Sequence, residues 1–178
     1  DKAERPMLIL GQGPLCRPDG AAILAMAGAL AERFGMVSEE WNGFNVLHTA
    51  AGRVGGLELG LVPGEGGLDV AGMLQPGALD VLFLVGADEV EAKGLGGTFV
   101  VYLGTHGDRG VHAADVILPG AAYTEKHGTW VNTEGRPQRG KLAVFPPGEA
   151  KEDWRILRAL SEAVGRTIPL NSLGEVRR

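Results

Sequence analysis

Acidic and imidazole side chains follow two apolar runs that the sequence predicts to be strands, Val81–Val85 and Phe99–Leu103. The residues in question are Asp88 and Glu89 after the first run, and His106 and Asp108 after the second. Because α/β proteins bind ligands at the carboxyl ends of parallel strands, these side chains are candidates for a site. The alternative, which we favour, is that they are solvated loop residues.

A second candidate is the Gly11-Gln12-Gly13 sequence that follows the apolar run Met7–Leu10. Two glycines after a strand are typical of a dinucleotide-binding turn, which needs a third glycine and a later acidic residue. Cys16 stands where that glycine should be, and the acidic candidate Glu32 lies inside a predicted helix. An ordinary strand–loop–helix turn is therefore the favoured interpretation.

The single cysteine limits the redox and metal chemistry that this chain can perform. Cys16 alone forms no intramolecular disulfide and supplies one of the four thiolates that an iron–sulfur cluster usually needs. The histidines are His48, His106, His112 and His127. None shows the close pairing of a zinc motif, although His106 and His112 could approach in space. We expect no catalytic residue, no metal and no iron–sulfur cluster in these 178 residues.

The most patterned part of the chain is residues 114–145, which we call the signature module. Asp115–Leu118 is a short run of strand formers that Pro119 ends, because proline has no N–H for a ladder. Gly128–Asn132 alternates like a strand, and Thr133-Glu134-Gly135 has the composition of a turn before Arg136. The module therefore predicts a β-hairpin with Gly135 at positive φ.

The same module resembles a family pattern, and the resemblance extends over nearly the whole chain, most strongly from Asp80 to Leu173. The matching residues are Glu125-x-x-Gly128-Thr129-x-x-Asn132-x-Glu134-Gly135-Arg136-x-Gln138. This pattern is similar to that near the end of the core of molybdopterin oxidoreductases. The stretch Leu118–Lys126, LPGAAYTEK, is closer still to one branch, the large iron–sulfur subunit of respiratory complex I.

The resemblance assigns two possible roles to the polar residues of the pattern, Glu125, Asn132, Glu134 and Arg136. In active relatives similar residues lie near the pterin cofactor, so here they could line a remnant pocket. Alternatively, Glu134 and Arg136 pair locally while Asn132 caps the turn. The structural role is favoured because the complex I branch lacks the molybdenum centre.

For function, the resemblance implies a structural, non-catalytic domain of the large iron–sulfur subunit of proton-translocating NADH–quinone oxidoreductase. Its partners would be other hydrophilic-arm subunits, on the cytoplasmic or mitochondrial matrix side of the inner membrane. Iron–sulfur clusters would lie in an N-terminal region of the parent subunit. One alternative is the cofactor-gripping part of an active molybdopterin enzyme such as a formate-dehydrogenase-like oxidoreductase. Another is an independent nucleotide-binding module.

Composition is consistent with these implications. The net charge of −5 and the scattered basic residues argue against nucleic-acid binding. The longest apolar run, Ala21–Ala31, is about half of the ~20 residues that span a bilayer, so we expect no membrane insertion. The chain opens on DKAER without methionine, so we expect no signal peptide and a piece of a longer protein.

The elements that position these residues follow an α/β order, and we expect one domain over 1–178. We predict a three-layer, mostly parallel sheet with flanking helices and an appended β-hairpin. Met7–Leu10 is expected to be a buried parallel strand. An apolar helix capped by Asp19 and ended by Gly35 should be sandwiched, and Asn45 should cap a second helix through Glu58.

Two further helices are predicted downstream. Asp69–Gln75 should form a short one before Pro76-Gly77. Residues 152–165 should form the C-terminal helix, opened by Glu152 and Asp153 because acidic side chains favour a helix N-terminus. Its expected inner stripe is Trp154, Leu157, Leu160, Ser161 and Val164, with Arg155, Arg158 and Glu162 outside.

Overall fold

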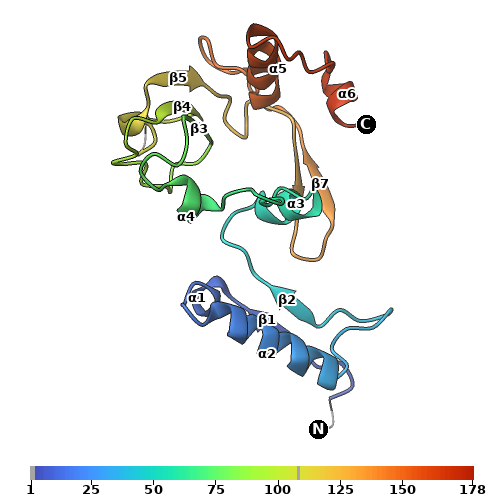
Figure 1. Cartoon of the computed structure of the whole chain (residues 1–178). Coiled ribbons are helices and arrows are strands. Elements are labelled where there is room, and N and C mark those ends of the chain that lie inside the picture. Colours follow the sequence, from blue (N-terminus) through green and yellow to red (C-terminus); the bar gives the residue numbers. More distant parts are fainter. Residues whose placement is uncertain (1–2, 108) are drawn as a thin grey trace. The chain divides into compact units, whose positions relative to one another are not determined.

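The computed structural model describes residues 3–107 and 109–178, which form two compact units (Figure 1). The first unit contains the described residues up to Val62 together with Thr129–Gly140, and the second contains Pro63–Gly128 and Lys141–Arg178. The expectation of one domain over 1–178 stays a prediction.

The first unit pairs two short parallel strands and adds a hairpin. Its elements are β1 (Leu8–Leu10), α1 (Gln12–Leu15), α2 (Gly20–Arg33), β2 (Phe44–Val46), α3 (Arg53–Glu58), β6 (Gly128–Val131, of which Gly128 falls in the second unit) and β7 (Pro137–Gly140). β1 pairs with β2 in parallel, with Ile9 opposite Asn45, and β6 pairs with β7. α2 packs on β1, and its buried side chains are those of Ala27 and Ala31.

The second unit is built around a three-stranded parallel sheet. Its elements are α4 (Val70–Met73), β3 (Val81–Val85), β4 (Phe99–Gly104), the 3₁₀ turn η1 (Val111–Ala113), β5 (Val116–Pro119), α5 (Asp153–Ala163) and α6 (Leu173–Val176). The strand order is β3-β4-β5. Central β4 is the most buried strand, with Leu103 fully buried, because strands on both sides and packed loops cover it.

The predicted α/β class with parallel sheets, flanking helices and a hairpin is confirmed, with the parallel pairing divided between two sheets. Strand β5 ends at Pro119 on the sheet edge, where a missing N–H leaves no ladder position unsatisfied. Asp69 caps α4, since its side chain accepts from the Gly72 N–H. None of the helices in the described part of the chain is both long and apolar enough to cross a bilayer.

Three expectations about the first unit are wrong. Asn45 does not cap a helix but lies inside β2, and α3 begins after Gly52. β1 is parallel but not buried, since Ile9 is 56% exposed. α2 ends before Gly35 at φ +59°, as predicted, yet it is not sandwiched, because Met26 on its surface is 68% exposed.

The inner stripe predicted for α5 is also partly wrong. Leu157 and Val164 are exposed, whereas Ser161 is buried and Leu160 is half-buried. The cause is the C-terminal tail, which folds back on the helix. The Ser161 hydroxyl donates to the Arg158 carbonyl at 2.6 Å and accepts from the Ile168 N–H at 3.0 Å. The tail thus covers the side of α5 that carries Arg158 and Ser161.

Candidate functional site

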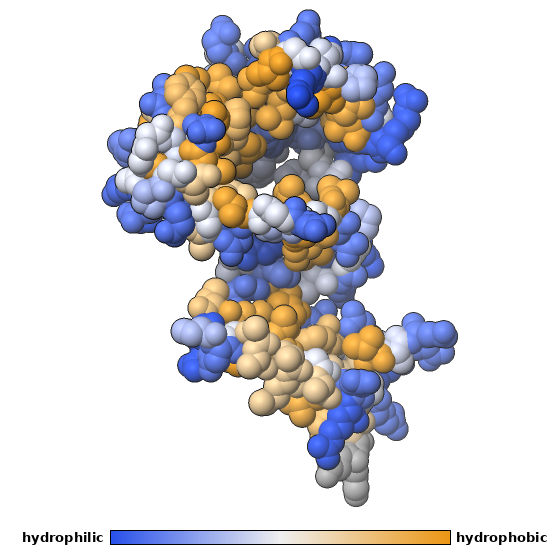
Figure 2. Space-filling view, viewed as in Figure 1, coloured by the Kyte–Doolittle hydropathy of each residue, from blue (hydrophilic) through white to orange (hydrophobic). Residues whose placement is uncertain are grey.

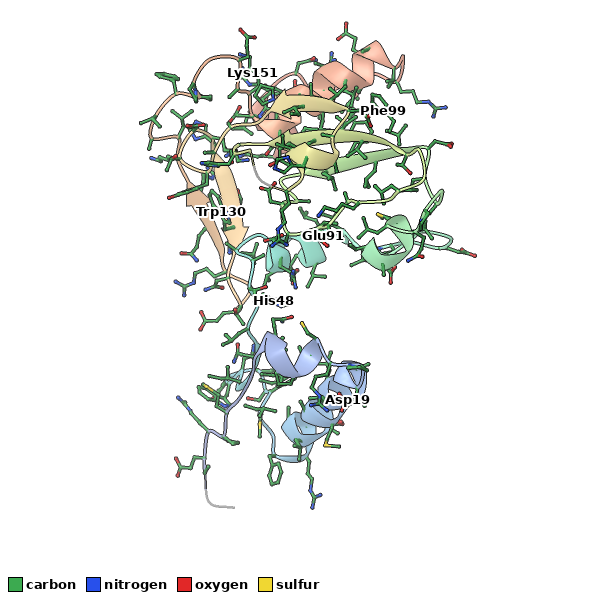
Figure 3. All side chains as sticks on the ribbon, turned by 90° about the vertical axis from the view of Figure 1, so that its left-hand side faces the viewer. Asp19, His48, Glu91, Phe99, Trp130 and Lys151 are labelled. Carbon is green, nitrogen blue, oxygen red and sulfur yellow. The ribbon has the colours of Figure 1, made fainter. Side chains whose placement is uncertain are left out.

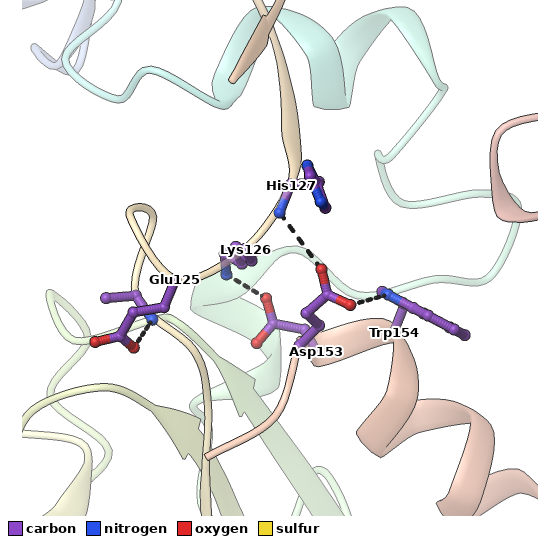
Figure 4. Close-up of polar contacts among 7 residues, drawn as sticks. Glu125, Lys126, His127, Asp153 and Trp154 are labelled. Atoms are coloured by element: carbon purple, nitrogen blue, oxygen red, sulfur yellow. Dashed lines mark hydrogen bonds and ion pairs between the residues drawn. The ribbon is translucent and has the colours of Figure 1, made fainter. Parts of the chain in front are cut away.

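The strongest polar cluster of the second unit joins the signature module to the start of α5 (Figure 4). The Lys126 ammonium lies 2.6 Å from a carboxylate oxygen of Asp153, and the two side chains are 26% and 35% exposed. Asp153 opens α5, where the helix dipole favours a negative charge. The Lys126 ammonium therefore neutralises the Asp153 carboxylate, which the helix dipole of α5 already stabilises.

The neighbouring Glu152 carboxylate, 12% exposed, collects three further donors. One oxygen accepts from the His127 backbone N–H at 3.4 Å. The other accepts from the Trp154 indole N–H at 2.9 Å and from the Arg155 guanidinium at 3.1 Å. Figure 4 shows the first two of these contacts on the two sides of the same carboxylate. Glu152 thereby ties the segment before β6 to the first turn of α5.

Backbone contacts reinforce this connection. The fully buried Ala121 donates its N–H to the Lys151 carbonyl at 2.8 Å, and Lys151 donates to the Pro119 carbonyl at 3.1 Å. The Glu125 carboxylate accepts from the Ala122 N–H at 2.9 Å, which folds the segment between β5 and β6 back on itself. The residues after β5 therefore form an ordered junction rather than a loose loop.

A cavity of about 390 Å³ opens beside this junction. Its charged and imidazole lining residues are Glu125, His127, Lys151, Glu152 and Arg155. One oxygen of the Glu125 carboxylate and both oxygens of the Glu152 carboxylate accept protein N–H groups, and the His127 Nδ1 accepts from the Leu142 N–H at 3.3 Å. These hydrogen bonds hold Glu125, His127 and Glu152 in place around the cavity.

The hairpin tip of the first unit holds the other signature residues. The Asn132 side-chain oxygen accepts from the N–H groups of Glu134 at 3.1 Å and Arg136 at 2.9 Å, so Asn132 caps the turn as predicted. Gly135 has φ +80°, as predicted. Within the described residues no ion pair joins Glu134 to Arg136, and both side chains are exposed. The structure thus brings Asn132, Glu134 and Arg136 together, while Glu125 belongs to the other unit.

The hairpin is fixed by packing as well as by its turn. Trp130, which Figure 3 labels on β6, is half-buried and covers Gly140 on β7. A Cβ atom at Gly140 would lie 2.4 Å from the Trp130 ring, so the paired strand needs glycine there. Val131 lies against Gly55 of α3, where a Cβ would approach it to 3.3 Å. Trp130 is therefore a packing residue.

At the carboxyl ends of β3 and β4, Tyr102 contacts the loops that follow both strands, and the sequence analysis did not single it out as a site residue. The Tyr102 hydroxyl, on a side chain 1% exposed, donates to the Asp88 carboxylate at 2.5 Å and lies 3.1 Å from the His106 carbonyl. The favoured interpretation of Asp88 as a solvated loop residue is wrong. Glu89 and His106 are exposed, and Asp108 lies outside the described residues.

The glycines after β1 form an ordinary turn. Gly11 precedes α1, and a Cβ at Gly11 or Gly13 would meet no atom within 4 Å, so no close backbone approach requires glycine. The Gln12 amide donates to the Leu47 carbonyl at 2.8 Å. Cys16 is an exposed free thiol.

The start of α2 carries an exposed ion pair. The Arg17 guanidinium donates to the Asp19 carboxylate at 2.7 and 2.9 Å, which lowers the pKa of that carboxyl below its usual value. Asp19 is the residue before α2, as predicted, but its side chain makes no capping hydrogen bond because Arg17 occupies it. In the part of the chain that the structure describes, no group of three or more His, Cys, Asp or Glu residues is arranged to hold a metal ion.

Comparison with known proteins gives the family. The family model described as molybdopterin oxidoreductase matches residues 1–163. The NADH-ubiquinone oxidoreductase 75 kDa subunit of Reclinomonas americana is 41% identical over 177 residues, 98% of this chain and 25% of that protein. The mitochondrial NADH-ubiquinone oxidoreductase 78 kDa subunit of Candida albicans is 44% identical over 179 residues, 99% of this chain and 24% of that protein.

A bacterial relative matches the chain with similar identity and coverage. An NADH-quinone oxidoreductase subunit of Rickettsia bellii is 39% identical over 175 residues, 98% of this chain and 24% of that protein. The chain therefore spans about a quarter of the length of these relatives. With a family match over residues 1–163, this chain belongs to the molybdopterin oxidoreductase family, and it is similar to the 75 and 78 kDa subunits of NADH-ubiquinone oxidoreductases and to a subunit of an NADH-quinone oxidoreductase.

Proposed function

We propose that this chain is a structural, non-catalytic domain of the large iron–sulfur subunit of a proton-translocating NADH–quinone oxidoreductase. It supports electron transfer that other parts of the complex carry out. Its partners are the rest of that subunit and other subunits of the hydrophilic arm, on the cytoplasmic or matrix side of the inner membrane. The iron–sulfur clusters belong to the N-terminal region of the parent subunit.

The observation that carries the proposal is which donors the side-chain oxygens of Glu125 and Asn132 accept from. A side chain that grips a cofactor must present free donors or acceptors to it. Here the Glu125 carboxylate accepts from Ala122, and the Asn132 oxygen accepts from Glu134 and Arg136. These hydrogen bonds stabilise residues 120–126 and the turn, which supports a structural role for the pattern.

The alternative is the cofactor-gripping part of an active molybdopterin enzyme such as a formate-dehydrogenase-like oxidoreductase. The family match over residues 1–163 is compatible with it. The two functions differ in the cofactor of the full-length protein. Measurement of molybdenum and of the fluorescent oxidised pterin in the purified parent protein distinguishes them. We expect neither, and a stoichiometric amount of both would establish the alternative.

The structural role also predicts how a variant of the junction behaves. Replacement of Lys126 by alanine removes the partner of Asp153 and should lower the free energy of unfolding by about 1 kcal/mol, as for a half-buried ion pair. In the assembled complex, the variant should reduce the amount of complex recovered while NADH–quinone turnover per complex is unchanged.

The chain offers a matched control. Lys93 pairs with Glu91 at 3.5 Å, and both side chains are mostly exposed, at 78% and 64%. Lys93→Ala should change neither stability nor yield, because solvent screens such a pair. A loss of turnover per complex in Lys126→Ala, with yield unchanged, would contradict the structural role.

A further inference from the structure

One face of the two-stranded sheet of the first unit carries three exposed apolar side chains around Asn45. Side chains alternate along a strand, so Met7 and Ile9 share a face, and Asn45, opposite Ile9, shares it with Leu47. The Leu47 N–H donates to the Leu10 carbonyl at 2.8 Å, which continues the ladder beyond β2. Met7, Ile9 and Leu47 are 51%, 56% and 48% exposed. Leu8 and Leu10, on the other face, are half-buried.

Helix α2 has an uncovered apolar side of its own. Met26, Leu30 and Phe34, the residue that follows α2, succeed one another at four-residue spacing and form one stripe, with the Arg33 guanidinium 5.8 Å from the centre of the Phe34 ring. They are 68%, 41% and 48% exposed. Figure 2 shows apolar side chains at the surface over this helix. The charged residues of α2, Glu32 and Arg33, lie only in its last turn.

Neither the exposed sheet face nor the exposed apolar stripe is usual in a complete α/β domain. Parallel sheets occur almost only with both faces covered, and a helix that is apolar on most sides is normally buried. A sheet of two short strands also leaves both edges open, and such a sheet is marginally stable by itself. The β1–β2 sheet with α2 therefore has the character of one slice of a larger layered domain.

We propose that the Met7–Ile9–Leu47 face and the Met26–Leu30–Phe34 stripe are docking surfaces for the same polypeptide, supplied by parts of the parent subunit outside residues 1–178. This proposal rests on the proposed function, which makes the chain a segment of a longer subunit. The relatives are about four times as long as the matched region, so about three quarters of their length lies outside it. That remainder is large enough to supply both a helix for the sheet face and a cover for the stripe.

The first test measures whether the surfaces are covered in the purified full-length parent subunit. Hydroxyl-radical footprinting followed by mass spectrometry reports the exposure of individual side chains, and methionine reacts readily. Met7 and Met26 should be oxidised on the order of tenfold more slowly in the native subunit than in the same subunit unfolded in urea, since covered side chains are shielded from solvent. Equal rates in the native and unfolded subunit would overturn the proposal.

The second test identifies what covers them. p-Benzoylphenylalanine is placed at Ile9 or Met26 of the parent subunit, with exposed Glu39 of the same unit as the control position. After irradiation, we expect cross-links from Ile9 and Met26 to peptides of the same polypeptide outside residues 1–178, and few from Glu39. Cross-links confined to residues 1–178, to a second copy, or to another subunit would overturn the proposal.

These tests are separate from those of the proposed function. Cross-links within one polypeptide are read by mass, whatever the cofactor content or activity of the subunit. A parent protein that contains molybdopterin would contradict the structural function while leaving the cross-link pattern unchanged. The reverse result, a subunit without pterin whose Met26 is fully exposed, would contradict only the docking surfaces.

Discussion

At the scale of single residues, the hydrogen bond from the Tyr102 hydroxyl to the Asp88 carboxylate joins strand β4 to the loop after β3. Position alone predicted that Asp88 lies at the carboxyl end of a strand. The hydrogen-bond donor to Asp88 could not be predicted, because from the sequence Tyr102 is only one of the strand-forming residues of Phe99–Leu103. The contact depends on how the loop after β3 returns to β4, and on Gly110, where a Cβ atom would lie 2.6 Å from the Tyr102 ring.

Removal of the Tyr102 hydroxyl should therefore be costly. Tyr102→Phe leaves the half-buried Asp88 carboxylate without its donor and should lower the free energy of unfolding by ~1–3 kcal/mol. Urea unfolding of the single variants and of Tyr102→Phe combined with Asp88→Ala gives the coupling energy. The exposed neighbour Glu89 provides the control, and Glu89→Ala should have little effect. Additive effects of the two substitutions would refute the coupling.

Gly135 shows the opposite case, in which sequence predicts a backbone conformation correctly. Thr133-Glu134-Gly135 between two strands indicates a turn, and φ at Gly135 is +80°. Gly135→Val should cost at least ~1 kcal/mol because a β-branched side chain is strained at positive φ. Gly135→Asn should cost less, since asparagine tolerates this conformation. Thermal melts of the two variants should differ, and equal midpoints would disprove the strain argument.

At the scale of elements, short continuous apolar runs predicted the strands well, and non-local contacts explain the failures. Val81–Val85 and Phe99–Leu103 are dense in β-formers, and they pair in parallel, the first buried on one face and the second on both. Asn45 was misassigned because an Asn before an apolar stretch is typical of a helix N-terminus. Pairing of Asn45 with Ile9 in the β1–β2 sheet outweighs that local preference.

Helix α5 gives an element-scale prediction about packing. Leu160 is half-buried, so Leu160→Ala should lower the free energy of unfolding by about 2 kcal/mol, the lower end for truncation of a core leucine. Val164, on the same predicted stripe, is 64% exposed, and Val164→Ala should change it by less than about 0.5 kcal/mol. Denaturant unfolding of both variants measures the difference. If Leu160→Ala also shifted it by less than that, its side of α5 would be an interface rather than part of the core.

At the scale of the whole chain, the resemblance in sequence predicted the family correctly. The structure adds the local contacts of the residues that make up the pattern. The pattern from Glu125 to Gln138 reads as one continuous motif, yet it is divided between two compact units. Sequence could not predict that division, because it arises from which segments pack together rather than from the spacing of the motif. The polar residues of the motif are consequently used in two separate local structures.

The metal content of the chain is the prediction that belongs to this scale, because it depends on every possible ligand together. Cys16 is exposed and is the one cysteine, and clusters of iron and sulfur usually need four. His106 and Thr105 pair with each other at 2.8 Å, and His127 accepts from Leu142, so these imidazoles are engaged locally. We expect elemental analysis of the purified chain to give substoichiometric iron, zinc and molybdenum. Cys16→Ser should give the same values, which separates adventitious binding by the thiol from a built site. One equivalent of any of the three metals, retained in both forms, would contradict the assignment of the redox centres to another part of the parent protein.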